Sequence, residues 1–355
     1  MLADLLIDNA DLVATCAGPG PRRGSAQREI SALPNASVAG FEGRIVFVGS
    51  AHDAKSAVTL APHAQVIDAQ GCTVVPGFVD PHTHLVFAGD RRDELRRRLG
   101  GASYADIAAS GGGIVKTVDA TRFASEHDLI DGARKRLAEM LSFGTTTAEA
   151  KSGYGLGLPA ERKMLCAIRN LAAGQAIELT ATFMGAHEVP VEFRHDRGAY
   201  VREVIDVMIP AVAEEGLAEW CDVFCEQGVF TPDESRDILE AGLHHGLKPR
   251  IHADELALSG GSRVAAEVGA RSADHLIFVD EPHARMLAAK NVVATLWRID
   301  DRSAADLAGR FSRALTGASP AEALATAQRE LIRGGTYRRP YYWAAYVVSG
   351  SGIVR

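Results

Sequence analysis

The chain has 355 residues, of which 47% are hydrophobic and 23% charged, which is typical of a globular protein with one barrel-sized domain and a smaller one. The net charge of −7, with no basic tract, argues against nucleic acid as a partner. No apolar stretch approaches the roughly 20 residues that span a bilayer, and the acidic N-terminus is unlike a signal peptide, so we expect a cytoplasmic protein without membrane contact.

The first 70 residues form short β-like runs separated by turns rich in Gly, Pro and Ser. The runs are LLIDNADLVAT (5–15), GRIVFVGS (43–50) and AQVIDAQG (64–71). This pattern predicts a small β-rich domain over residues 1–70.

Residues 71–290 alternate predicted strands with predicted helices. A buried-type strand, CTVVPGFVDPHTH (72–84), comes first. Further strands are expected at 145–151, 177–187, 221–226, 248–254 and 272–278, and helices at 126–144, 159–174, 199–216, 231–246 and 260–270. This alternation implies an α/β fold of βα units around a parallel sheet, either a barrel or a doubly wound sheet.

Three histidines favour the barrel. His187, His252 and His275 each fall at or just past the C-terminal end of a predicted strand. In a (β/α)₈ barrel these strand ends converge on the face that carries the active site. One such histidine is more often a surface or core residue, but the repetition predicts a shared site.

The pair His82 and His84 predicts a metal site. Side chains at i and i+2 of a strand point to the same side, and neutral imidazoles placed there can chelate one cation. His252 is the best third ligand, and Asp254 and Glu255 directly after it supply carboxylates that are placed to act as a general base. An isolated His-x-His is more often accidental, and it is the combination that favours a catalytic metal site.

These segments also resemble a known family. VVPGFVDPHTHLVFAGDRRDE, GTTTAEAKSGYGL, FMGAHEVP, CDVFCEQGVFT, HADEL and SADHL are similar to motifs of the imidazolonepropionases, within the amidohydrolase superfamily. The resemblance runs from about residue 3 to about residue 290. It implies a (β/α)₈ barrel beside a small β-sandwich, one Zn²⁺ or Fe ion, and a homodimer. The implied activity is hydrolysis of the small molecule 4-imidazolone-5-propanoate to N-formimidoyl-L-glutamate in histidine degradation.

The resemblance also assigns roles to residues. It implies that His82, His84 and His252 bind the metal, that Glu255 activates water and returns its proton to the leaving nitrogen, and that His275 polarises the attacked carbonyl.

For the substrate, the resemblance implies that Arg91 binds the propanoate, that Tyr154 and His187 contact the ring, and that Tyr104 and Glu255 line the pocket. From the residues alone, Arg91 is more often one of several surface arginines, and Tyr154 is more often a packed loop aromatic.

The C-terminal segment departs from the family pattern. The family's last barrel strand carries an aspartate in a Thr-Asp-x-Asn-Pro-Gly-like run, which this sequence lacks. Residues 291–350 instead resemble the C-terminal end of a CHAT domain, without its upstream histidine and cysteine. We therefore predict domains at 1–70, 71–290 and 291–355, a barrel incomplete at its last strands, and impaired activity. Asp300 or Asp301 is a weak candidate for the missing ligand.

Two alternatives remain open. One is a non-catalytic chimeric protein whose CHAT-like tail is an interaction surface. The other is a different amidohydrolase, acting on another cyclic amide or deaminating a base.

Overall fold

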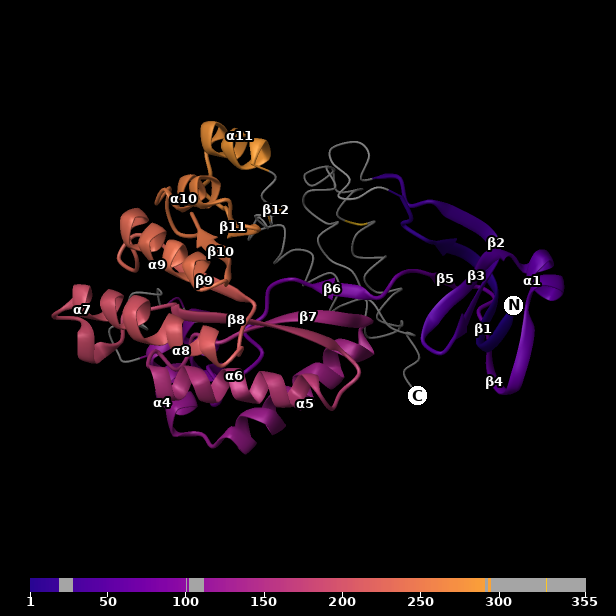
Figure 1. Ribbon diagram of the computed structural model, residues 1–355, viewed down its shortest axis with the longest axis horizontal. Helices are drawn as coiled ribbons and strands as arrows, with labels where there is room; N and C mark the ends of the chain where they lie inside the picture. The colour runs from indigo at the N-terminus through magenta and orange to yellow at the C-terminus, as the bar shows by residue number, and fades with distance from the viewer. Residues whose placement is uncertain (19–27, 100, 102–111, 291–292, 295–329, 331–355) are drawn as a thin grey trace. The chain divides into compact units, whose positions relative to one another are not determined.

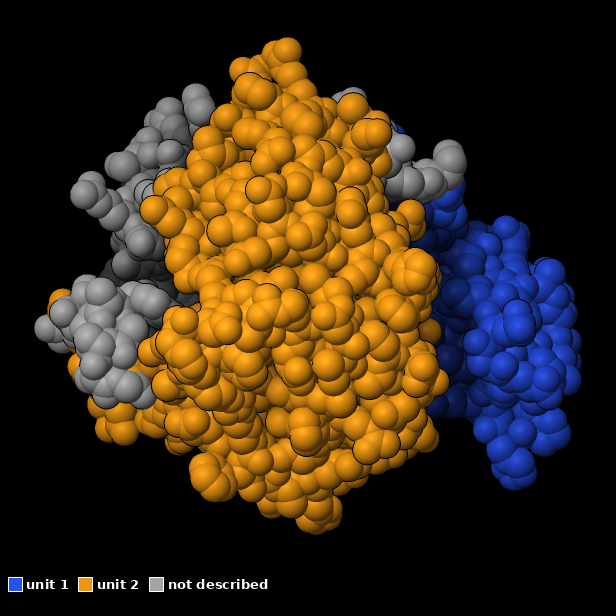
Figure 2. All heavy atoms as spheres, turned by 60° about the vertical axis from the view of Figure 1, so that its left-hand side comes forward, with its two compact units in different colours: residues 1–78 blue, residues 79–355 orange. Residues whose placement is uncertain are grey.

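The computed structural model describes residues 1–18, 28–99, 101, 112–290, 293–294 and 330. The chain divides into two compact units, residues 1–78 and 79–355, which Figure 2 colours separately. Tyr104, Asp300, Asp301 and nearly all of the CHAT-like segment lie outside the described residues. Within the described residues, no helix is long and apolar enough to cross a membrane.

The first unit, as far as it is described, is one five-stranded sheet with a short helix, α1 (Ala51–Ala57). The strand order is β3-β2-β1-β4, and β5 also pairs with β1. Strand β1 is antiparallel to β2 and parallel to β4 and β5. The strands are β1 (Leu2–Ala14), β2 (Ala32–Phe41), β3 (Arg44–Ser50), β4 (Thr59–Asp68) and β5 (Thr73–Val74).

The sequence runs predict β1, β3 and β4 but not β2. Strand β2 contains Pro34, Asn35 and Gly40, residue types that strands disfavour, so its pairing with β1 overrides a weak local preference. The buried core of this unit is small and consists of Ala10, Val13, Ala36 and Ala69.

The second unit contains a curled seven-stranded sheet in the order β12-β11-β10-β9-β8-β7-β6 (Figure 1). Every pairing from β7 to β12 for which the register is defined is parallel, as the βα alternation predicts. The strands are β6 (Phe78–Asp80), β7 (Thr145–Lys151), β8 (Glu178–Ala186), β9 (Trp220–Cys225), β10 (Lys248–Ala253), β11 (Ser272–His275) and β12 (Val293–Ala294).

Helices connect these strands and pack against them, with α6 on β8, α9 on β9 and α10 on β10. Capping boxes start two of them, at Ser125 before α5 and at Thr231 before α9. The helices are α2 (Arg92–Leu99), α4 (Ile114–Phe123), α5 (Glu126–Ser142), α6 (Leu158–Ala172), α7 (Arg197–Arg202), α8 (Ile209–Glu214), α9 (Pro232–His244), α10 (Gly261–Val268) and α11 (Glu281–Ala289), with a 3₁₀ turn at Val191–Phe193.

The helix predicted over 199–216 forms as three continuous pieces. A π-helical segment, Glu203–Met208, separates α7 from α8. Pro210 lies in the first turn of α8 and has no N–H to donate to the preceding turn. A locally wider helix accommodates the missing donor, and hydrophobic periodicity alone does not reveal this.

Candidate metal centre

The C-terminal ends of the strands gather the predicted site. His187 follows β8 by one residue, His252 is the penultimate residue of β10, and His275 ends β11. His82 and His84 lie just beyond β6 in a segment without regular secondary structure, not within a strand as the sequence suggested. Their side chains nevertheless meet that of His252 near the end of β10, so the residues come together through a different local structure.

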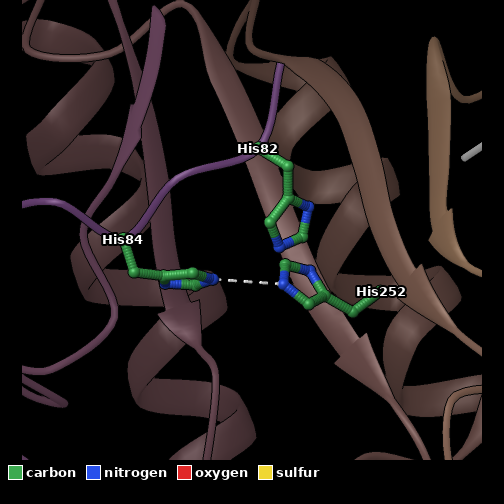
Figure 3. A group of neighbouring side chains, drawn as sticks. All are labelled: His82, His84 and His252. Carbon is green, nitrogen blue, oxygen red and sulfur yellow. Dashed lines mark hydrogen bonds between the residues drawn. The ribbon is translucent and has the colours of Figure 1, made fainter. Parts of the chain in front are cut away.

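His82, His84 and His252 bring one ligand atom each to a common point, within 4.8 Å of one another. The Nε2 atoms of His84 and His252 are 3.3 Å apart, as the dashed line in Figure 3 shows. Two histidine nitrogens bound to one tetrahedral zinc at 2.0–2.1 Å would be separated by about 3.3–3.4 Å. The three side chains therefore fit a single small cation between them.

Two buried carboxylates orient two of these rings. The Nδ1 atom of His82 is 2.8 Å from Asp274 Oδ2, and that of His252 is 3.0 Å from Asp222 Oδ1. A carboxylate bound to Nδ1–H keeps the proton on that nitrogen, so the Nε2 lone pair faces the site. This is the arrangement of metal-binding histidines, and it is a second observation in favour of the metal.

Burial keeps the site histidines neutral. It lowers the pKa of His252 to about 3 and those of His187 and His275 to about 4. Burial, reinforced by the neighbouring histidines, also holds the pKa of His84 well below its usual value. The Nδ1 atom of His84 has no hydrogen-bond partner within the described part of the chain. Neutral imidazoles with free lone pairs are what a cation requires.

Glu255 and His275 form a pair beside the three histidines. Glu255 Oε2 is 3.5 Å from His275 Nε2, and the rings of His275 and His252 are 5.1 Å apart. Burial raises the pKa of Glu255, and the charge of Glu226 raises it further. Asp254, next to Glu255, accepts hydrogen bonds from backbone N–H groups of the loop that leads into α10. Asp254 therefore holds the loop, while Glu255 faces the site.

Two of the predicted substrate-binding residues, His187 and Tyr154, lie next to His84. The ring of His187 stacks on His84 at 4.8 Å, and the ring of Tyr154 is 5.7 Å from His84. The Nδ1 atom of His187 is 2.9 Å from the Gly153 carbonyl oxygen, which ties it to the loop of Tyr154.

The charge of Arg91 affects the pKa of Tyr154. Burial raises the pKa of Tyr154, and the charge of Arg91 partly offsets the effect. The Arg91 side chain is partly exposed, and its Nε donates to Glu94 Oε2 at 2.6 Å. Arg91 is therefore an exposed side chain that Glu94 holds in place.

Buried charged residues lie behind the histidines, and the sequence analysis does not single them out. Asp222 is the one charged residue in the strand WCDVFC, which was a usable signal because a buried charge requires a specific partner. Lys151 and Asp274 are also buried, but their strands, TTTAEAK and SADH, contain other polar residues and give no such contrast.

Family models match two parts of the chain. Residues 65–103 match the amidohydrolase family, and residues 286–351 match the CHAT domain. Solved structures similar to the chain include a 5-methylcytosine deaminase from Klebsiella pneumoniae, with 17% identity and a TM-score of 0.55 over 81% of this chain and 64% of that one. An amidohydrolase from a Sargasso Sea sample has 16% identity and a TM-score of 0.54, over 86% and 65% of the two chains. These likenesses show the amidohydrolase fold, and the chain spans less than two thirds of either structure.

Sequence relatives are much more similar. The imidazolonepropionase of Symbiobacterium thermophilum is 50% identical over 292 residues, which cover 82% of this chain and 68% of the relative. That of Myxococcus xanthus is 49% identical over 293 residues, covering 82% and 69%. The strand-end histidines, the carboxylates behind them and this level of identity agree, and the chain belongs to the imidazolonepropionase family.

Proposed function

We propose that the chain hydrolyses 4-imidazolone-5-propanoate to N-formimidoyl-L-glutamate, with one zinc or iron ion held by His82, His84 and His252. The main support for this proposal is the convergence of these three histidines beside the Glu255–His275 pair. The identity of 45–50% to several imidazolonepropionases supports the choice of substrate.

The bound ion would supply Lewis acidity toward water and the ring carbonyl. Glu255, with its raised pKa, accepts the proton of the attacking water and delivers it to the ring nitrogen as the C–N bond breaks. His275 is neutral at pH 7, so it can donate an N–H to the developing oxyanion.

Other side chains hold the substrate. The guanidinium of Arg91 binds the propanoate, since its planar fork matches a carboxylate. Tyr154 and His187, tied together by the Gly153 carbonyl, contact the ring. Tyr104, which the resemblance also implies as a pocket residue, lies outside the described residues.

The experiment measures metal content and the decay of the imidazolone absorbance in the zinc- or iron-loaded full chain. Glu255→Gln should reduce kcat by at least about 100-fold, as is usual for loss of a general base, and should retain the metal. Glu240→Gln, an exposed substitution on α9, should leave both unchanged. Comparable turnover in Glu255→Gln and the unmodified chain would contradict the role of Glu255.

The missing last-strand aspartate favours a second candidate, a non-catalytic protein with a CHAT-like interaction tail. The same experiment separates the two. A chain that binds one metal ion but does not consume the substrate supports the second candidate, whereas a chain that binds no metal contradicts the first one outright.

The resemblance to enzymes of histidine degradation also supports a cytoplasmic homodimer. Light scattering of the purified chain at micromolar concentration tests the dimer, and cell fractionation tests the location. A monomer at all accessible concentrations would refute the first of these.

A further inference from the structure

Lys151 ends strand β7 and lies directly behind the predicted metal ligands. Its side chain is completely buried. The ammonium is 2.6 Å from Asp222 Oδ2, 2.9 Å from Glu149 and 3.6 Å from Asp274 Oδ2. Three carboxylates therefore converge on one nitrogen in the interior of the unit.

Two of these carboxylates also bind the histidines. Asp222 uses its other oxygen, Oδ1, for the ring of His252, while Asp274 Oδ2 contacts both the ring of His82 and the ammonium. The position of Lys151 thus determines where both carboxylates sit, and the carboxylates determine where both rings point.

The ammonium is charged in this setting. Burial alone would lower the pKa of Lys151, but Asp222 and Glu149 outweigh it and raise the pKa. A cation among carboxylates is thus maintained in the interior, where an unpaired charge would be costly.

The same surroundings would suit a metal ion. Asp222, His252 and Asp274 offer ligand atoms within 4.8 Å of one another, in a group that shares His252 with the three-histidine group. The Nδ1 of His252 is already bound to Asp222, so the available donors are the carboxylate oxygens of Asp222, Asp274 and Glu149 around the ammonium, which are ordinary ligands of zinc. The surroundings of the Lys151 ammonium therefore contain the ligand atoms of a second cation site.

We propose that Lys151 is an internal counter-cation that occupies the place of a second divalent ion and fixes the two carboxylates that orient His82 and His252. Lys151 is a positioning residue that sets the stoichiometry at one metal ion per chain. This inference rests on the proposed three-histidine metal site.

The test titrates metal-free full-length protein with zinc alone and measures bound zinc after removal of excess. The unmodified chain should bind one equivalent. Lys151→Ala removes the charge and opens space, so it should bind two. Lys151→Met removes the charge but fills the space, so it should bind one.

Cobalt provides an independent readout. The visible spectrum of the Co²⁺-loaded Lys151→Ala variant should gain a second set of bands during the titration, whereas Lys151→Met should show one set. A purely structural role for Lys151 would change stability but neither the stoichiometry nor the number of spectral components.

One equivalent in Lys151→Ala, with the spectrum of the unmodified chain, would overturn the inference and leave the proposed function intact. No zinc in the unmodified chain would instead contradict the proposed function. If Lys151→Ala folds poorly, its thermal stability should rise with zinc more steeply than that of Lys151→Met, because a second bound ion adds stabilisation by mass action. Equal zinc dependence of the two variants would also overturn the inference.

Discussion

Glu255 and Glu226 show how neighbouring side chains set the pH range of the site. Glu226 Oε2 accepts hydrogen bonds from the backbone N–H groups of Glu255 and Leu256, at 2.9 and 2.8 Å. Its negative charge raises the pKa of Glu255 beyond the effect of burial. Since a general base must be ionised, kcat/KM should fall as the pH drops through this raised pKa.

Glu226→Gln should move the acidic limb of the kcat/KM profile to lower pH. The amide oxygen can still accept from the two backbone N–H groups, but the charge that raises the pKa of Glu255 is lost. The pH dependence of turnover by the metal-loaded chain checks this. Glu240→Gln is the control, and an unmoved or upward-shifted acidic limb in Glu226→Gln would contradict the assignment.

The loop between β7 and α6 depends on a single buried carboxylate. Glu161, in the first turn of α6, accepts hydrogen bonds from the backbone N–H groups of Gly153, Gly155 and Leu156 at 2.7–3.2 Å. The close packing of Gly155 against Glu161 leaves no space for a side chain, since an added Cβ would lie 2.5 Å from the Glu161 backbone nitrogen. This loop presents Tyr154 to the site.

Glu161→Ala should lower the free energy of unfolding by about 3–5 kcal/mol. Three buried N–H groups would lose their acceptor, at roughly 1–3 kcal/mol each. Urea denaturation at pH 7 checks the value. The exposed change Glu240→Ala should alter stability by less than about 0.5 kcal/mol. A loss of the same size in both variants would show that Glu161 does not hold the loop.

Periodicity predicted the elements of the second unit well because its strands are short and most of them are followed by an amphipathic helix. β7 and α5 appear almost as expected, at Thr145–Lys151 and Glu126–Ser142. The errors lie where tertiary structure overrides local preference, as in β2, or where one residue removes a hydrogen bond, as at Pro210. The segment without regular secondary structure that carries His82 and His84 could not be distinguished from a strand by its sequence.

The two units have very different cores. Among the described residues, the buried apolar side chains of the first unit are seven alanines and Val13, whereas the second unit has an extensive apolar core between its sheet and helices. Local stability follows the amount of buried apolar contact.

Amide hydrogen exchange should therefore be faster in the first unit. Backbone amides of β1 should lose protection before those of β9, which lies within the larger core. Mass spectrometry of peptides covering Leu2–Ala14 and Trp220–Cys225 checks the order. Equal protection of the two strands would mean that the first unit is stabilised by contacts beyond its own core.

At the scale of the molecule, the sequence predicted which histidines would meet but not what holds them in place. The meeting of His82, His84 and His252 follows from strand ends that converge on one edge. The partners Asp222, Asp274 and Lys151 depend on the strand register that aligns β7, β9 and β11, which a single sequence does not encode in any short motif.

The ends of β10 and β11 have one further property, a left-handed backbone at residues that carry side chains. Asp254, His275 and Leu276 have φ values of 51°, 73° and 52°. Such geometry costs on the order of 1 kcal/mol per residue, and glycine would relieve it. Asp254 and Leu276 are buried, and Asp254 accepts three backbone N–H bonds, so glycine would lose those contacts. Laboratory evolution for heat resistance alone, with turnover left unselected, would therefore be expected to introduce glycine first at His275, at the expense of a group proposed to act on the substrate.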